Sequence, residues 1–288
     1  MKEGRGWSPF SCAMFVVLFV VAAIINHQPL LDILHIGISD EEQSHIFLVP
    51  VIAAWLLWLR KSRFRCVRFQ PSLVGPGLIA AGTAMSWWGF NSGTQIAWHA
   101  GVGVVFVGVV VSMTGMEPLR QFAPVFGVLV FALPVPGVVR EALAIPLQSL
   151  ATVVTQSTLE LIGVASTRLG NVLMVNGQQI AVGEACNGMR MVFAFFLIVY
   201  AFAFSVPLKM SSRLVLLAIS PVVALLCNVI RLVPTSLIYG YGTAHSAEWF
   251  HTWTGWLMIP IALAALVGLL KLFRWLEVPV MSLRLAMQ

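Results

Sequence analysis

The sequence predicts an all-α integral membrane protein with about eight transmembrane helices, a periplasmic amphipathic helix and a short β-hairpin. Apolar residues make up 59% of the 288 residues and charged residues only 10%. Soluble domains hold about 45–50% apolar and about 25% charged residues. The mean hydropathy of +0.92 therefore excludes a water-soluble enzyme, and intrinsic disorder needs the opposite balance. Uncharged apolar stretches also recur along the whole chain.

Each expected span is an uncharged stretch close to the roughly 20 residues that cross a bilayer as a helix. Polar residues from Asn91 to Gln95 separate the third span from the fourth, and the fifth contains three prolines. A periplasmic insert at 140–186 separates the fifth from the sixth. We expect one multispan domain over 1–288, with spans at roughly 9–31, 44–59, 72–90, 96–116, 122–139, 188–206, 214–231 and 252–273.

The charges predict the orientation of these spans. With eight spans both termini lie on one side of the membrane. Thirteen of the 17 Lys and Arg residues then fall on that side, with only three of the 11 acidic residues. Because an excess of Lys and Arg marks the cytoplasmic side, both termini are expected there. This asymmetry explains the net charge of +6 better than a basic groove for nucleic acid does.

Two features of the insert are predicted. Residues 142–159 are uncharged but rich in Gln, Ser and Thr, with apolar residues at helical spacing, which favours an interfacial helix on the outer surface. If this helix were embedded as a span instead, Lys209 and Arg213 would move outside. Two short apolar runs flank Asn176-Gly177, and this pattern is typical of a hairpin with a type I′ turn.

Cys186 is the cysteine most suited to chemistry. It stands where the sixth span begins, and helix N-termini lower thiol pKa values. Arg190 follows one turn later and adds positive charge. The alternative is a small buried cysteine, which we expect for Cys12 and Cys227. The four cysteines form no CxxC pair and no Cys/His metal spacing, so neither a metal nor a cofactor is expected.

Arg231, in Asn228-Val-Ile-Arg231, ends the seventh span. An ionisable group inside a membrane is costly and is therefore a functional candidate, whereas the alternative is an arginine that snorkels to the interface. His245 and His251 precede the eighth span, although a lone histidine is more often structural. Cys, His and Arg at one depth supply a nucleophile, an acid/base and an oxyanion donor. No acidic residue lies inside an expected span, which argues against a proton-coupled carrier.

Taken in order, these motifs resemble the exosortases of the exosortase/archaeosortase superfamily. His251 stands where the archaeal branch is expected to carry Arg, which favours the bacterial branch. Asn187 stands where Ser is commoner. The resemblance covers about residues 40–260 and consists of Ser44-His45-x-x-Leu48-Val-Pro50 running to Trp58-Leu-Arg60, Leu133-Pro-Val-Pro136 followed by Ile145-Pro-Leu-Gln148, Glu184-Ala-Cys186-Asn187-Gly188-Met-Arg190, Asn228-x-x-Arg231 and His251-x-x-x-Gly255.

The resemblance implies a membrane cysteine protease or transpeptidase on the periplasmic side of the bacterial inner membrane. It would process exported proteins with a PEP-CTERM-type tag: a Pro-Glu-Pro-like motif, a hydrophobic helix and a basic end. Cys186 would be the nucleophile, Arg231 the substrate or oxyanion stabiliser, and His251 the acid/base. The site-shaping and supporting residues would be Glu184, Asn187, Gly188, Arg190, Asn228 and His245. The alternative function is a non-enzymatic multispan transporter or scaffold in exopolysaccharide export.

The charge asymmetry predicts the result of a topology experiment. Reporter fusions after Gly177 and His245 should show periplasmic activity, and a fusion after Gln288 should show cytoplasmic activity. The matched fusion after Arg68 follows a cluster of basic residues and should also be cytoplasmic. Periplasmic activity from that fusion would contradict the expected topology.

Overall fold

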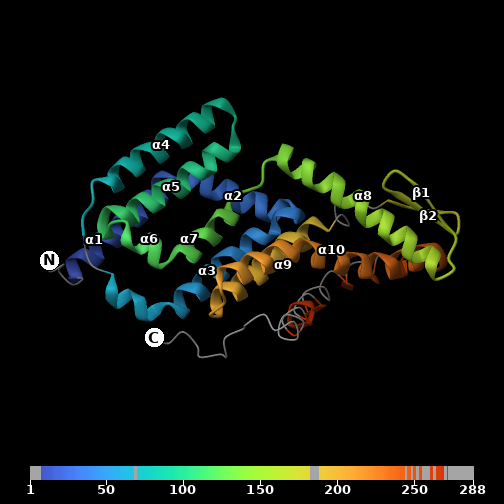
Figure 1. Cartoon of the computed structure of the whole chain (residues 1–288). Coiled ribbons are helices and arrows are strands. Elements are labelled where there is room, and N and C mark those ends of the chain that lie inside the picture. Colours follow the sequence, from blue (N-terminus) through green and yellow to red (C-terminus); the bar gives the residue numbers. More distant parts are fainter. Residues whose placement is uncertain are drawn as a thin grey trace. The chain divides into compact units, whose positions relative to one another are not determined.

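The computed structural model is mostly helical and contains one small sheet (Figure 1). It describes residues 8–67, 70–181 and 188–243, together with 245–247, 249–250, 253–254, 260–261, 264–268 and 271. The chain divides into two compact units, one up to Pro136 and one from Gly137 onward. Each unit is described below on its own.

The first unit begins with two helices, α1 (Pro9–Ile25) and α2 (His27–Ser39), which meet at an angle of 71°. The expected span at 9–31 is therefore not one continuous helix. The helix breaks because the side chain of Asn26 donates a hydrogen bond to the carbonyl of Ala22 at 2.8 Å. Pro29, three residues later, has no N–H with which to continue the α1 hydrogen-bond ladder.

The second expected span, at 44–59, corresponds to a 3-10 helix η1 (Glu41–Phe47) that leads into α3 (Leu48–Leu59). Asp40 caps η1, since its carboxylate accepts a hydrogen bond from the N–H of Glu42 at 3.0 Å. The short helix η2 (Lys61–Cys66) follows α3 and carries basic residues.

The third and fourth expected spans correspond to α4 (Val74–Ser92) and α5 (Gln95–Thr114), which pack as a tight hairpin. Gly93 ends α4 in the left-handed conformation, at φ 69°. A Cβ atom on Gly101 would lie 2.5 Å from the backbone nitrogen of Ser86, and one on Gly82 would lie 2.7 Å from the carbonyl of Gly101. The two backbones therefore approach through glycines, as is common between helices in membranes.

A carboxylate lies in the apolar part of this unit, contrary to expectation. Asp32 belongs to α2, and its Oδ2 lies 2.9 Å from Nε2 of His99 on α5. The ring of His99 is 1% exposed and stacks on Trp98 at 5.0 Å between centroids. The sequence placed Asp32 just past the end of a span at 31, whereas the helix continues to Ser39. The pair joins α2 to α5.

The fifth expected span, 122–139, is not one continuous helix. After α6 (Glu117–Gln121), α7 (Ala123–Leu129) and the 3-10 turn η3 (Val130–Ala132) form ten helical residues. Leu133 is extended, at ψ 128°, because a residue before proline avoids the helical region. Ten residues are about half of what a bilayer requires.

The second unit begins with α8 (Gly137–Leu161), followed by a sheet of β1 (Ser166–Leu169), β2 (Val172–Val175) and β3 (Gln178–Ala181). The strands are antiparallel in the order β1-β2-β3. Asn176 and Gly177 have φ values of 48° and 75°, which confirms the predicted type I′ turn. The sequence analysis missed β1, because Ser-Thr-Arg-Leu shows no apolar alternation.

The stretch 142–159 lies within α8 and is helical, as predicted. Its buried face holds Ala151, Thr152, Thr155 and Leu159. Ala151 and Leu159 belong to a core that also includes Leu173, Val175 and Ile180 of the sheet and Leu225 and Leu232 of the last long helix. Apolar side chains such as Leu143, Ile145 and Leu150 are exposed. By length and composition α8 could also cross a membrane.

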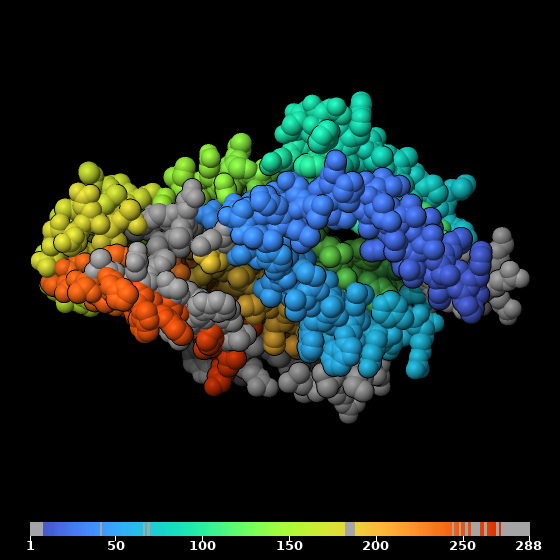
Figure 2. Space-filling view, turned by 180° about the vertical axis from the view of Figure 1, so that it is seen from behind, coloured from blue at the N-terminus to red at the C-terminus, as the bar shows by residue number. Residues whose placement is uncertain are grey.

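The second unit also contains the helices α9 (Met189–Ser205) and α10 (Met210–Tyr241). They pack on each other through a core that includes Phe195, Val199 and Leu216. The expected end of the seventh span, at 231, is not the end of this helix, which continues through Pro234 for ten more residues, to Tyr241. The strands lie directly on this added part, as Figure 2 shows for the yellow strands and the orange end of α10.

Four helices in the described part of the chain are long and apolar enough to cross a membrane, or five if the bent pair α1–α2 counts as one span. They are Glu42–Leu59, Gln95–Thr114, Gly137–Leu161 and Met210–Tyr241. The α7–η3 stretch and α9 are shorter. The expected span 252–273 falls mostly outside the described residues, so eight spans are not confirmed.

The close approach of α4 and α5 predicts a difference between two glycines of one helix. Gly101→Ala places a methyl group against the backbone of α4 and should cost about 1–3 kcal/mol, the usual cost of overpacking. A Cβ atom on Gly103 would have no neighbour within 4 Å, so Gly103→Ala should be neutral or slightly stabilising. Thermal unfolding in detergent measures both, and equal melting temperatures would contradict the packing.

Candidate active site

The described part of the candidate site begins at the start of α9. Gly188 precedes the helix, is buried and has a φ of 82°, a left-handed conformation that favours glycine. A Cβ atom here would lie 3.0 Å from Nδ2 of Asn228 on α10. The chain thus needs glycine at 188 for two reasons, and the beginning of α9 contacts α10 at Asn228.

A stripe of buried polar residues runs along α10 at this contact. Asn228 is fully buried and Arg231 is 7% exposed. Positions three and four residues apart lie on one face of a helix, so Arg231 and Thr235 continue the stripe. The hydroxyl of Thr235 donates to the carbonyl of Arg231 at 2.7 Å. A guanidinium stays protonated in proteins, so this face holds a permanent buried positive charge.

The burial of Arg231 bears on the interfacial alternative. A snorkelling arginine extends its charged end into water, whereas Arg231 is only 7% exposed. Burying a charge costs several kcal/mol even after relaxation. The burial of Arg231, beside Asn228, therefore differs from that of a snorkelling side chain.

The remaining predicted site residues divide into two groups. Arg190 lies in the first turn of α9 and is exposed, and His245 is also exposed. Glu184, Cys186, Asn187 and His251 lie outside the described residues. The structure thus brings Gly188 to Asn228, with Arg231 one turn further along α10, and it does not test whether Cys186 and His251 meet them.

Two tryptophans close to His251 in the chain are exposed. Trp249 and Trp253 are 58% and 60% exposed, and their ring centroids are 5.7 Å apart. Exposed aromatic rings at one helix face are typical of a membrane interface.

In the first unit, two motifs of the family resemblance meet. The side chain of Gln43, next to Ser44-His45, accepts a hydrogen bond from the N–H of Val135 at 2.8 Å. His45 is 3% exposed, and its Nδ1 lies 3.2 Å from the carbonyl of Glu42. The sequence analysis did not single out His45 as a site residue. Its signal was a polar pair, Ser-His, at the start of an apolar run.

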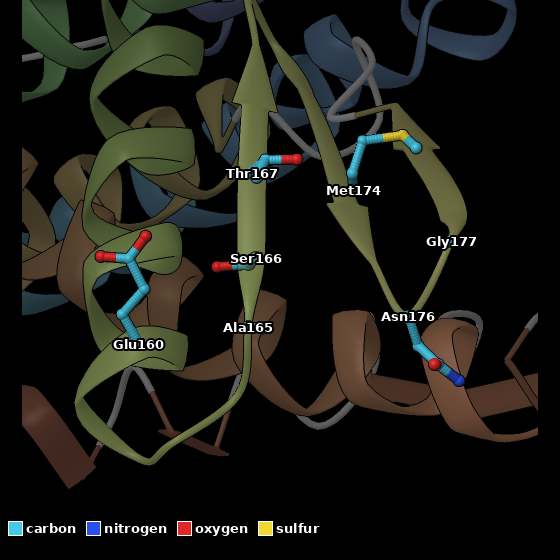
Figure 3. Close-up of a pocket in the computed structure, with 7 residues that line it drawn as sticks. All are labelled: Glu160, Ala165, Ser166, Thr167, Met174, Asn176 and Gly177. Carbon is cyan, nitrogen blue, oxygen red and sulfur yellow. The ribbon is translucent and has the colours of Figure 1, made fainter.

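A shallow pocket of about 460 Å³ lies between the end of α8 and the strands (Figure 3). Ser166 points toward the side of Glu160 and Thr167 points away from it, as alternation along a strand requires. Of the predicted site residues that the structure describes, none lines this pocket. We also find no group of three or more His, Cys, Asp or Glu placed to hold a metal ion among the described residues.

Fold and site together define a helical membrane protein that keeps an arginine and an asparagine buried where one helix begins against another. The family described as transmembrane exosortase (Exosortase_EpsH) matches residues 37–268. Since this is most of the chain, the protein belongs to the transmembrane exosortase family. Membership supports a membrane transpeptidase- or protease-like role. Comparisons with curated proteins and with solved structures found no match.

The contact between Gly188 and Asn228 predicts a difference between two left-handed glycines. Gly188→Ala and Gly163→Ala both force a side chain into the left-handed region, at about 1–2 kcal/mol. Gly163 has a φ of 84° and nothing within 4 Å, so only the change at 188 also displaces Asn228. Processing of a co-expressed tagged protein should fall in Gly188→Ala and persist in Gly163→Ala. Equal activity of both variants would contradict the importance of this contact.

Proposed function

We propose that the protein is an exosortase-type cysteine protease/transpeptidase. It cleaves the PEP-CTERM-type sorting signal at the C-terminus of exported proteins, at the outer face of the bacterial inner membrane. The observation that carries the proposal is the burial of Asn228 and Arg231 on α10, with Asn228 against Gly188. Gly188 follows Cys186 by only two residues in the chain, so the residue that contacts Asn228 is close in sequence to the proposed nucleophile.

In the proposed reaction the Cys186 thiolate attacks the substrate carbonyl. A carbon–sulfur bond forms, and the carbonyl oxygen becomes an oxyanion that the Arg231 guanidinium stabilises. His251 protonates the departing amine as the peptide bond breaks, which leaves a thioester on Cys186. A second nucleophile then gives up its proton to His251, attacks the thioester and releases the product with the thiol restored.

The length of α10 supports a site near one membrane surface. A helix of 32 residues is about 48 Å long, whereas the hydrocarbon core is about 30 Å thick. Counted from the basic residue Arg213, about 20 residues bring the helix to the opposite boundary, close to residue 233. Arg231 then lies just inside that boundary, on the side away from Lys209 and Arg213.

The sheet independently supports a position of Arg231 close to one membrane surface. Open strand edges do not occur within hydrocarbon, because their backbone groups would lack partners. The side chain of Asn176 donates to the carbonyl of Gly240 at 3.0 Å, which ties the hairpin turn to the end of α10. This end therefore belongs outside the hydrocarbon, and under the positive-inside rule it is the periplasmic end.

The experiment that tests the proposed function replaces the cysteines one at a time. Cys186→Ala should abolish processing of a co-expressed tagged protein while the membrane-inserted amount stays normal. Cys12→Ala, Cys66→Ala and Cys227→Ala should keep activity, since Cys12 is an exposed residue of α1 and Cys227 is a buried helical residue. Normal processing by Cys186→Ala would contradict the proposal that the protein is a cysteine enzyme and would favour the alternative of a non-enzymatic scaffold.

Arg231 and His251 should differ in their pH dependence. Arg231→Lys keeps a charge but loses the planar fork, so processing should fall at every pH, by about 10²–10³ as for a lost oxyanion donor. His251→Ala should flatten the pH profile, because histidine changes charge near neutral pH. Alkylation of Cys186 should also slow in that variant. An unchanged alkylation rate would exclude His251 as the activating base and make His245 the next candidate.

A further inference from the structure

The two edges of the sheet differ. At one edge, β1 lies along α8, and the guanidinium of Arg168 reaches the carbonyl oxygen of Ser149 at 3.5 Å. At the other edge, β3 packs on α10 through Ile180, which is buried in the same core as Leu225. Within the described part of the chain, β3 pairs with β2 alone, so its outer side is an open strand edge.

The register shows which backbone groups of β3 face outward. In a hairpin with a two-residue turn, the residues flanking the turn exchange hydrogen bonds, and such pairs alternate along the strands. Val175 pairs with Gln178, and Leu173 pairs with Ile180. The backbone N–H and C=O groups of Gln179 and Ala181 therefore point away from β2, and both residues are exposed.

Within the residues that the structure describes, the outer edge of β3 also lacks the usual protection. Natural edge strands carry Lys, Pro, bulges or inward charges that prevent other strands from pairing. The four residues Gln178 to Ala181 contain neither a charge nor a proline, whereas β1 carries Arg168. An exposed strand edge of this kind can be extended by a strand from a binding partner.

The chain connects this edge directly to the proposed nucleophile. Cys186 follows Ala181 by five residues, and five extended residues reach at most about 18 Å. The sheet itself is anchored on α10 by the hydrogen bond from Asn176 to Gly240, which lies further along the helix than the buried Arg231. A peptide paired with β3 is thus held within a short distance of the segment that bears the thiol.

We propose that the outer edge of β3 binds the extended substrate segment that carries the scissile bond, as an added strand. This inference rests on the proposed function, because it takes the tagged exported protein as the substrate. A Pro-Glu-Pro motif suits this mode. Residues two apart in a strand face the same way, so both prolines turn their missing N–H away from β3 while the glutamate N–H between them faces it.

A proline substitution tests the edge in the full-length protein in membranes. Gln179→Pro removes an N–H that points away from β2, so the β2–β3 pairing stays. Processing of a co-expressed exported protein with a Pro-Glu-Pro motif, a hydrophobic helix and a basic tail should fall about tenfold, the effect of one or two backbone hydrogen bonds. The matched variant Arg168→Pro makes the same change on the other edge and should keep activity. Undiminished processing by Gln179→Pro overturns the proposal.

Photo-crosslinking tests docking without the chemistry. In a Cys186→Ala background, a photoreactive residue at position 179 should capture the tagged segment. The same residue at 169, where Leu169 of β1 is 79% exposed, should not. No capture at 179, or equal capture at both positions, overturns the edge proposal. This result is separable from a failure of the proposed function, in which Cys186→Ala would still process the substrate.

Discussion

The burial of the Arg231 guanidinium is the constraint on which the second unit depends. The group cannot lose its proton, so a cation stays 7% exposed on a helix that is otherwise apolar enough to cross a membrane. The surrounding chain accommodates it with a polar stripe on α10 and with the close approach of Gly188 to Asn228. Glycine is favoured there, since the backbone is left-handed and a Cβ would press on the side chain of Asn228. The motif Asn228-x-x-Arg231 and the motif that contains Gly188 thus meet at one contact, between Asn228 and Gly188.

The small sheet complements this arrangement. A three-stranded sheet is marginal alone, and here Leu173, Val175 and Ile180 bury its inner face against α8 and α10. The carbonyl of Gly240 accepts a hydrogen bond from the side chain of Asn176, and a Cβ on Gly240 would lie 2.6 Å from the side chain of Val175. The sheet therefore sits closely on the end of α10, beyond the depth of Arg231. This placement keeps one polar, hydrogen-bonding edge next to the segment that holds the proposed nucleophile.

Local signals in the sequence predicted some elements well. The Asn176-Gly177 turn was predictable because both residues tolerate positive φ, and the α4–α5 hairpin was predictable from an apolar pattern with one polar break. Elements that depend on contacts between distant segments were not. The bend at Asn26, the pairing of Asp32 with His99, and the continuation of α10 through Pro234 all need a packing partner that no single stretch reveals.

The candidate site shows the same division. Residue chemistry singled out Arg231, the family resemblance added Asn228, and the order of motifs identified the family. The contact of Gly188 with Asn228, in contrast, joins two segments far apart in the chain. The exposed position of Arg190 was also not apparent, because a helical register alone does not say which face the protein buries. Identifying a left-handed glycine requires the backbone angles themselves.

The central claim is that Cys186 forms a covalent intermediate beside Arg231. Its most direct test is to trap a thioester between the protein and a co-expressed tagged substrate by acid quenching, followed by mass spectrometry of the membrane fraction. We predict an adduct on Cys186 that hydroxylamine cleaves, as a thioester requires, and that is absent from Cys186→Ala. Normal processing without any hydroxylamine-sensitive adduct on Cys186 would contradict the account.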